Sequence, residues 1–170
     1  EAEVRDFYER SSERYRLPER SRAGVIFWQL SPKATAEKRA ELAERAAAVR
    51  REAAKCDAVG FQELVRQHSE DQATRYRGGD TGWLKLGEPD PRWEPAVVSA
   101  IWSLDEPGAV SPVLTGERGM YVVRLAERQP AGRVPFEGVR EAIAYQLGRQ
   151  RQQDRQSNLI AGAKSRVQIE

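Results

Sequence analysis

The glycine-rich segment at residues 78–82 is the feature that most constrains the fold. Gly78-Gly79-Asp80-Thr81-Gly82 comes directly before Trp83 and a proline-rich stretch. Closely spaced glycines favour a tight turn, because glycine adopts positive φ without steric cost. We expect Asp80 to hold this turn through bonds to its own backbone. No strand–turn–helix setting surrounds the glycines, so a nucleotide-binding loop is not indicated.

The chain after this turn predicts a short helix and a β-hairpin. Pro107-Gly108 marks a turn, and β-forming runs follow at 109–114 and 120–125. Two short strands joined by a glycine-bearing loop, here 115–119, form a hairpin. The helix before them has one apolar face, with spacings of three and four: Val97, Ala100, Ile101 and Leu104.

The chain before the turn predicts one buried strand and two helices. The run from Arg22 to Leu30 contains AGVIFWQL, which is too continuously apolar for a surface strand and favours a central strand covered on both faces. A helix is expected from about Thr35 to Lys55. Gly60 interrupts the helical pattern, and a second short helix is predicted from Phe61. The first helix has an apolar stripe: Leu42, Ala46, Val49, Ala53 and Cys56.

Charged helices are predicted at both ends of the chain. Residues 3–16 read as a helix that Pro18 ends, and a long helix begins after a linker at 129–132. The order of elements indicates an α+β fold, a small antiparallel sheet wrapped by helices. We divide the chain into an N-terminal helical arm at 1–20, a domain at 21–128 and a C-terminal helical arm at 129–170. The two arms would form part of a second helical lobe.

Composition excludes several functional classes. Lys and Arg number 28 against 26 Asp and Glu, so the chain lacks the massed basic charge of a dedicated nucleic-acid binder. There is no apolar run of membrane-spanning length. With one Cys and one His, a zinc site is excluded, and we expect no metal and no cofactor. The sequence begins at Glu1 without a secretory signal, so we expect a trimmed piece whose N-terminus does not reveal its compartment.

Several motifs in order resemble the parvulin family of peptidyl-prolyl cis-trans isomerases. They are GGDTGW at 78–83, AIWSL at 100–104, PGAVSPV at 107–113 and GMYVV at 119–123. The resemblance implies a parvulin-like, FKBP-like core, and isomerisation of prolyl bonds to assist protein folding. The outer helices resemble segments that flank this domain in extracytoplasmic chaperones of the parvulin class. The resemblance therefore also implies an exported or periplasmic location, proline-containing or unfolded polypeptides as clients, and a possible homodimer through the arms.

The resemblance also implies a site. In this family two histidines lie at the floor of the site that binds the substrate proline. Their positions match Val25 and Tyr121 here, and a third floor position matches Asp71. We therefore predict Asp71 and Tyr121 as catalytic, with Tyr121 offering a hydroxyl in place of an imidazole. The predicted substrate-binding positions follow the family's proline slot and floor. Val25, Thr81 and Pro89 match by position, and Thr115 stands beside the matched Gly116. The family's phenylalanine matches Val97 when counted back from Ala100 or Trp93 when counted forward from Gly87.

Two hypotheses follow from this site. The first is an isomerase whose activity is weak because both family histidines are replaced. Rotation about a prolyl bond requires no nucleophile or metal, only desolvation and positioned hydrogen bonds, so activity does not depend on those histidines alone. The second is a non-catalytic peptide-binding chaperone module that kept the groove. A hydrolase finds no support, because no G-x-S-x-G motif and no spare histidine base are present.

Overall fold

The structure, a computed structural model, describes residues 1–167, with side chains described as far as residue 161. The chain divides into two compact units. One comprises Pro18–Pro130, and the other comprises Glu1–Leu17 together with Ala131–Glu170. No helix among the described residues is both long enough and apolar enough to cross a membrane.

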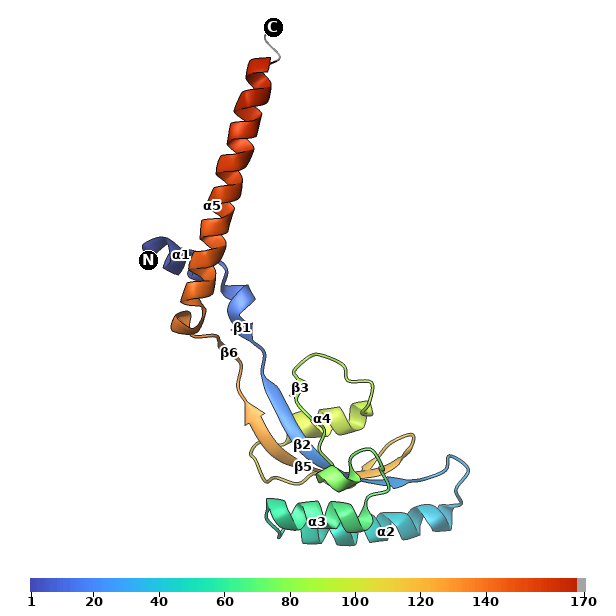
Figure 1. Cartoon of the computed structure of the whole chain (residues 1–170). Helices are drawn as coiled ribbons and strands as arrows, with labels where there is room; N and C mark the ends of the chain where they lie inside the picture. The colour runs from blue at the N-terminus through green and yellow to red at the C-terminus, as the bar shows by residue number, and fades with distance from the viewer. Residues whose placement is uncertain (168–170) are drawn as a thin grey trace. The chain divides into compact units, whose positions relative to one another are not determined.

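The larger unit is built on a four-stranded antiparallel sheet with the order β3-β2-β5-β4. The two long central strands are β2 (Arg20–Gln29) and β5 (Gly119–Gln129). The edges are short, β3 (Leu84–Lys85) on one side and β4 (Leu114–Thr115) on the other. The predicted central strand is confirmed, because residues 23–28 of β2 include only buried positions. The small antiparallel sheet of the predicted α+β fold is also confirmed (Figure 1).

Helices cover both faces of this sheet, so the unit has two hydrophobic cores (Figure 1). Helix α4 (Pro95–Ser103) packs on one face through Val97 and Ile101, which are fully buried. Helices α2 (Ala36–Ala53) and α3 (Ala58–His68) pack on the other. Alternate residues of β5 supply the two cores, because side chains of a strand point to opposite faces in turn. Tyr121 and Val123 belong to the α4 core.

The prediction that Gly60 interrupts the helical pattern is wrong, because α3 begins at Ala58. The Asp57 side chain caps this helix by accepting a hydrogen bond from the Gly60 N–H at 2.8 Å. A capping aspartate offsets the low helix propensity of glycine in the first turn. The glycine also has a packing reason, since a Cβ at Gly60 would lie 2.7 Å from the Cys56 Cβ.

The predicted hairpin exists with different bounds. The strand expected at 109–114 is only Leu114–Thr115, because Pro112 has no N–H for a ladder. The preceding residues follow β5 through single bonds, such as the Ser111 N–H to the Val123 carbonyl at 2.8 Å. Strand β5 continues to Gln129, beyond the predicted end, because β2 pairs with it as far as Arg20. The linker predicted at 129–132 is therefore wrong at both ends, because Gln129 belongs to β5 and Gly132 begins the short strand β6 (Gly132–Arg133).

The second unit contains α1 (Ala2–Arg10), the 3₁₀ turn η1 (Ser12–Tyr15) and α5 (Phe136–Val167). It also holds a two-stranded sheet that the sequence did not predict, β1 (Arg16–Leu17) paired with β6 (Gly132–Arg133). The helix predicted for 3–16 ends at Arg10, because Tyr15 turns back and its carbonyl accepts the Val134 N–H at 2.8 Å. The Tyr8 hydroxyl donates to the Val134 carbonyl at 2.6 Å and fixes the same segment. That the arms belong to a second helical lobe stays a prediction.

Candidate functional site

A hollow of about 230 Å³ lies in the larger unit, next to the hydrophobic core between α4 and the sheet. Its wall includes residues from β2, from the loop after α3, from the loop before α4 and from β5. Asp71 and Tyr121, the two predicted catalytic residues, both line it, as does Trp93. The full lining is Phe27, Asp71, Ala73, Thr74, Arg77, Arg92, Trp93, Arg118 and Tyr121.

An aromatic pair forms the apolar wall of the hollow. Phe27 of β2 and Tyr121 of β5 are register partners across the antiparallel pair. Their rings stack with centroids 4.9 Å apart at an interplanar angle of 28°. Both side chains are almost fully buried, at 7% and 3% exposure. Because each ring packs against the other, the pair gives the hollow an apolar wall that is part of the packed core.

The Tyr121 hydroxyl is tied to a carboxylate at the base of α4. It donates to Glu94 Oε1 at 2.7 Å, and the same carboxylate accepts the backbone N–H groups of Arg118 at 2.9 Å and Glu117 at 2.8 Å. Burial raises the pKa of Tyr121, and the neighbouring Glu94 carboxylate raises it further. Burial also acts to raise the pKa of Glu94, but its three hydrogen bonds outweigh burial and hold that pKa below the usual range. At neutral pH the pair is therefore a neutral phenol and a charged carboxylate.

Asp71 is positioned by the chain just before it. The Ser69 hydroxyl accepts the Phe27 N–H at 3.2 Å, and the Glu70 N–H donates to the Phe27 carbonyl at 2.7 Å. These bonds hold the loop after α3 against β2 at the residue that forms the aromatic wall. The Asp71 carboxylate in turn accepts the Thr74 hydroxyl and the Ala73 N–H. Asp71 thus both braces its turn and presents a carboxylate at the hollow.

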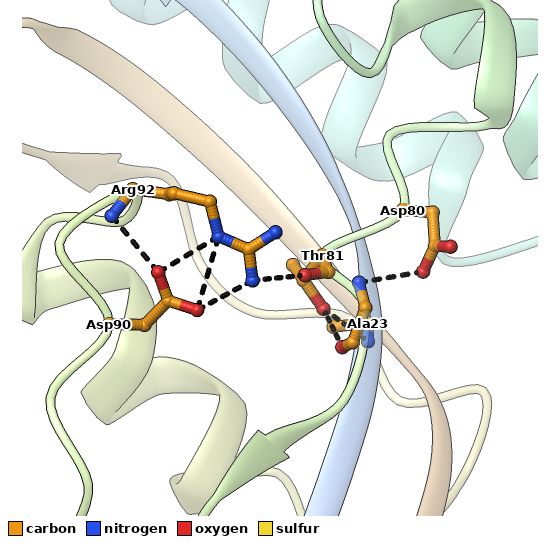
Figure 2. Close-up of polar contacts among 6 residues, drawn as sticks. Ala23, Asp80, Thr81, Asp90 and Arg92 are labelled. Carbon is orange, nitrogen blue, oxygen red and sulfur yellow. Dashed lines mark hydrogen bonds and ion pairs between the residues drawn. The ribbon is translucent and has the colours of Figure 1, made fainter.

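The loop that carries Trp93 contains an ion pair between Arg92 and Asp90, and the Trp93 backbone N–H donates to the Asp90 carbonyl at 3.1 Å. Figure 2 shows the Arg92 guanidinium bridging the Asp90 carboxylate, at 2.6 Å, and the Thr81 carbonyl, at 3.2 Å. The hydrogen bonds from Arg92 lower the pKa of Asp90, so this pair is charged at neutral pH. The Thr81 hydroxyl accepts the Ala23 N–H at 3.0 Å, which ties the glycine turn to β2. The loop before α4 is therefore connected through the turn to the sheet.

The remaining predicted substrate-binding residues do not line the hollow. Val25 and Val97 are fully buried in the core beneath it, and Thr81 is fully buried in the glycine turn. Pro89 and Thr115 are exposed and lie outside the lining. These five positions shape the walls from behind or lie apart from them, while Asp71, Trp93 and Tyr121 meet at one surface.

Sequence analysis missed several lining residues, above all Phe27 and three arginines. Phe27 was assigned to the buried strand without a site role, although its position two residues after Val25 places it on the same face of β2. Arg77, Arg92 and Arg118 come from three separate segments, η2 (Arg75–Arg77) and two loops. Arg77 directly precedes the glycine turn, and Arg118 lies in the hairpin loop. Their positions beside these two predicted turns were the only sequence signal for a place at the site. Within the described residues, no three His, Cys, Asp or Glu side chains gather as a metal site.

Comparison with protein families decides the family. Residues 1–141 match the family described as the PPIC-type PPIase domain. The chain belongs to this family. The predicted parvulin-type assignment is therefore confirmed, and the match covers the β-sheet unit, α1 and the first turns of α5.

Relatives of this PPIC-type chain include folding chaperones. It is 38% identical over 69 residues to the chaperone SurA of Nitrosococcus oceani, covering 41% of the chain and 15% of that protein. It is 28% identical over 96 residues to the foldase protein PrsA 2 of Bacillus cereus, covering 56% of the chain and 31% of that protein. The chain thus spans well under half the length of the curated relatives it matches.

Solved structures support the same fold. One belongs to work on two SurA-like chaperones of Campylobacter jejuni, with a TM-score of 0.60 at 20% identity, covering 94% of this chain and 61% of that one. Another is a PpiC-type peptidyl-prolyl cis-trans isomerase domain, with a TM-score of 0.52 at 23% identity, covering 68% of this chain and 95% of that one. At these identities the likeness concerns the fold of the PPIC-type chain.

Proposed function

We propose that this chain binds proline-containing segments of unfolded polypeptides in the hollow and isomerises their prolyl bonds. The observation that carries the proposal is the meeting of Asp71, Trp93 and Tyr121 around one cavity beside a fixed aromatic pair. Membership of the PPIC-type family supports it. A proline ring fits such a wall, because it is compact, apolar and carries no N–H that burial would leave unpaired.

The residues present can lower the rotation barrier of about 18–20 kcal/mol without a cofactor. Contact with Phe27 and Trp93 removes water that hydrogen-bonds the planar amide. In the planar amide the carbonyl oxygen carries resonance charge, which it loses in the twisted form. The Asp71 carboxylate at the hollow therefore destabilises the planar amide more than the twisted one, and this difference lowers the barrier. The Tyr121 hydroxyl, committed to Glu94, acts by shaping the site and offers its oxygen as an acceptor.

The test is acceleration of cis-trans exchange in a short Xaa-Pro peptide, measured by NMR. We expect Asp71→Ala and Tyr121→Phe each to lower the rate about two- to tenfold, the range of a weakened positioning contact. The matched control is Tyr76→Phe, because the Tyr76 side chain is 79% exposed and is not among the residues that line the hollow. Unchanged rates in both site variants, with the fold intact by amide spectra, would refute this site.

A non-catalytic peptide-binding module is the second candidate. The observation that favours it is the state of the two histidine-matched positions. Val25 is fully buried, and the Tyr121 hydroxyl is already bonded to Glu94. For such a module no rate above background is expected. Backbone amide shifts on adding a proline-rich peptide would still cluster around Trp93 and Tyr121, whereas shifts confined to α1 and α5 would contradict a groove in the larger unit.

Location outside the cytoplasm and a folding role are part of the same proposal. Support comes from the SurA and PrsA relatives and from the Campylobacter jejuni study, which names a periplasmic protein among its SurA-like chaperones. A homodimer through the helical arms stays a prediction. Leu159 and Ile160 on α5 are 76% and 50% exposed and would be covered in such a dimer. Light scattering across a concentration series tests it, and a constant monomer mass would contradict it.

A further inference from the structure

The charges around the hollow are unequal. Three of its lining residues are arginines, Arg77, Arg92 and Arg118, and only Asp71 among them is acidic. Arg92 is neutralised by its ion pair with Asp90. Within the described part of the chain, Arg77 and Arg118 take part in no ion pair. Arg77 and Arg118 therefore stand at this cavity without an ion-pair partner, although Arg77 lies near enough to Asp80, and Arg118 near enough to Glu94, to lower the pKa of that carboxyl group.

Both of these arginines are held where a bound peptide would pass. Arg118 follows Glu117 in the hairpin loop, and its guanidinium carbon lies 5.5 Å from the centre of the Phe27 ring, the wall expected to contact proline. Its backbone N–H is anchored by Glu94 at 2.9 Å. Arg77 ends η2 and donates one hydrogen bond to the Ala73 carbonyl at 3.0 Å. Among the residues that the structure describes, no further hydrogen bond engages either guanidinium, and each carries five N–H donors that can bind a ligand.

The nearby carboxylates act on this charge through space, without an ion pair. Asp71 accepts two hydrogen bonds from its own turn, from the Thr74 hydroxyl and the Ala73 N–H. Glu94 accepts three, from Tyr121 and from two backbone N–H groups. Neither is paired with Arg77 or Arg118, and a carboxylate on a ligand would meet cations with unused donors. Guanidinium groups bind carboxylates well because their fork geometry matches two oxygens.

We propose that the hollow selects prolyl segments in which a residue directly flanking the proline bears a carboxylate side chain, with Arg77 and Arg118 as the specificity-determining residues. This inference rests on the proposed function, because it names the substrate class of the same site. It differs from a preference for purely apolar segments, which the aromatic wall alone would give. The preference is electrostatic, so it weakens as salt screens the charges.

The experiment compares acetylated, amidated tetrapeptides with uncharged ends. Glu, Gln or Lys is placed before the proline in one set and after it in another, and exchange is measured by NMR at neutral pH and low salt. Glu and Gln have nearly the same shape, so their ratio isolates charge. We expect kcat/KM for the better Glu peptide to exceed that of its Gln match by about three- to tenfold, with Lys below Gln. The ratio should approach one in about 0.5 M salt.

Variants locate the charge that makes the difference. Arg118→Gln and Arg77→Gln should each lower the Glu-to-Gln ratio, and the double variant should bring it close to one. Arg45→Gln is the matched control, because Arg45 is an exposed arginine of α2 outside the hollow, and its ratio should equal that of the unmodified chain. Equal rates for Glu and Gln peptides, or a ratio that survives the double variant, would overturn the proposal.

The two proposals fail in different ways. If no peptide is accelerated, prolyl isomerisation is refuted, and the charge preference is then decided by binding. In that case amide-shift titrations with the same Glu and Gln peptides give two dissociation constants. A tighter Glu peptide that loses its advantage in the double variant supports the preference, and equal constants refute it. If Gln peptides are accelerated to the same extent as Glu peptides, prolyl isomerisation stands and the charge preference is refuted.

Discussion

Replacement of Glu94 by glutamine tests whether one carboxylate organises the site. Glu94 has two oxygens that accept three hydrogen bonds, from the Tyr121 hydroxyl and from the N–H groups of Glu117 and Arg118. It thereby joins the start of α4, the hairpin loop and β5. Glutamine keeps the shape and removes both the charge and one acceptor. In either orientation of the amide, its NH₂ faces a backbone N–H of the loop.

The cost follows from that mismatch. A buried donor left without an acceptor costs about 1–3 kcal/mol, and hydrogen bonds to a charged group are worth more than neutral ones. Glu117 and Arg118 are exposed, so water relieves part of the penalty. We therefore expect Glu94→Gln to lower the free energy of unfolding by about 1–2 kcal/mol. For a domain of this size the corresponding fall in Tm is about 4–8 °C.

Thermal and urea unfolding measure this change, and Glu117→Gln is the control, because it makes the same chemical replacement on an exposed side chain of the same loop. A double-mutant cycle with Tyr121→Phe should give a coupling of about 1 kcal/mol, since the two residues share one hydrogen bond. The pH dependence has a defined sign. The pKa of Glu94 in the folded chain lies below its ordinary value of 4.5, so its contribution is present above that pH and is lost as pH falls further.

The reasoning is refuted if Glu94→Gln is no more destabilising than Glu117→Gln near neutral pH. It is also refuted if the cycle with Tyr121→Phe shows no coupling. A destabilisation that stays constant from neutral pH down through the acid range would show that the charge of Glu94 is not the cause.

Two further predictions concern the glycine turn. Gly79→Ala should prevent stable folding or cost well over 2 kcal/mol, because Gly79 has φ +71° and a Cβ would overlap the Val25 backbone. Gly87→Ala, at φ +81° in open space, should cost only about 1–2 kcal/mol in urea unfolding. Equal costs for the two variants would contradict the packing argument. Asp80→Asn should cost under about 1 kcal/mol at neutral pH, because its ion pair with Arg22 is partly exposed. The hydrogen bond from Arg22 lowers the pKa of Asp80. The difference in unfolding free energy between Asp80→Asn and the unmodified chain should therefore disappear as pH falls below the usual aspartate range. A difference that persists there would exclude the ion pair as its source.

Comparison of sequence and structure shows which levels of the fold are local. The apolar run in β2 predicted a strand buried on both faces, and spacings of three and four predicted the packed sides of α2 and α4. These signals work because each residue's burial follows from its neighbours two to four positions away. The bounds of α3 depended on a cap at Asp57 that the sequence also contained but that the glycine signal obscured. Strands β3, β1 and β6 are two residues long and carry no pattern of their own.

The sequence by itself determined the family, the central strand and three of the residues that line the hollow. Only the tertiary structure decided that Phe27 stacks on Tyr121, that Glu94 receives the Tyr121 hydroxyl, and that Arg77 and Arg118 reach one cavity. The physical reason is that periodicity fixes which face of a strand or helix is buried. It does not fix which distant segment lies opposite, because that depends on strand register and on loops whose paths are set by hydrogen bonds across the whole unit.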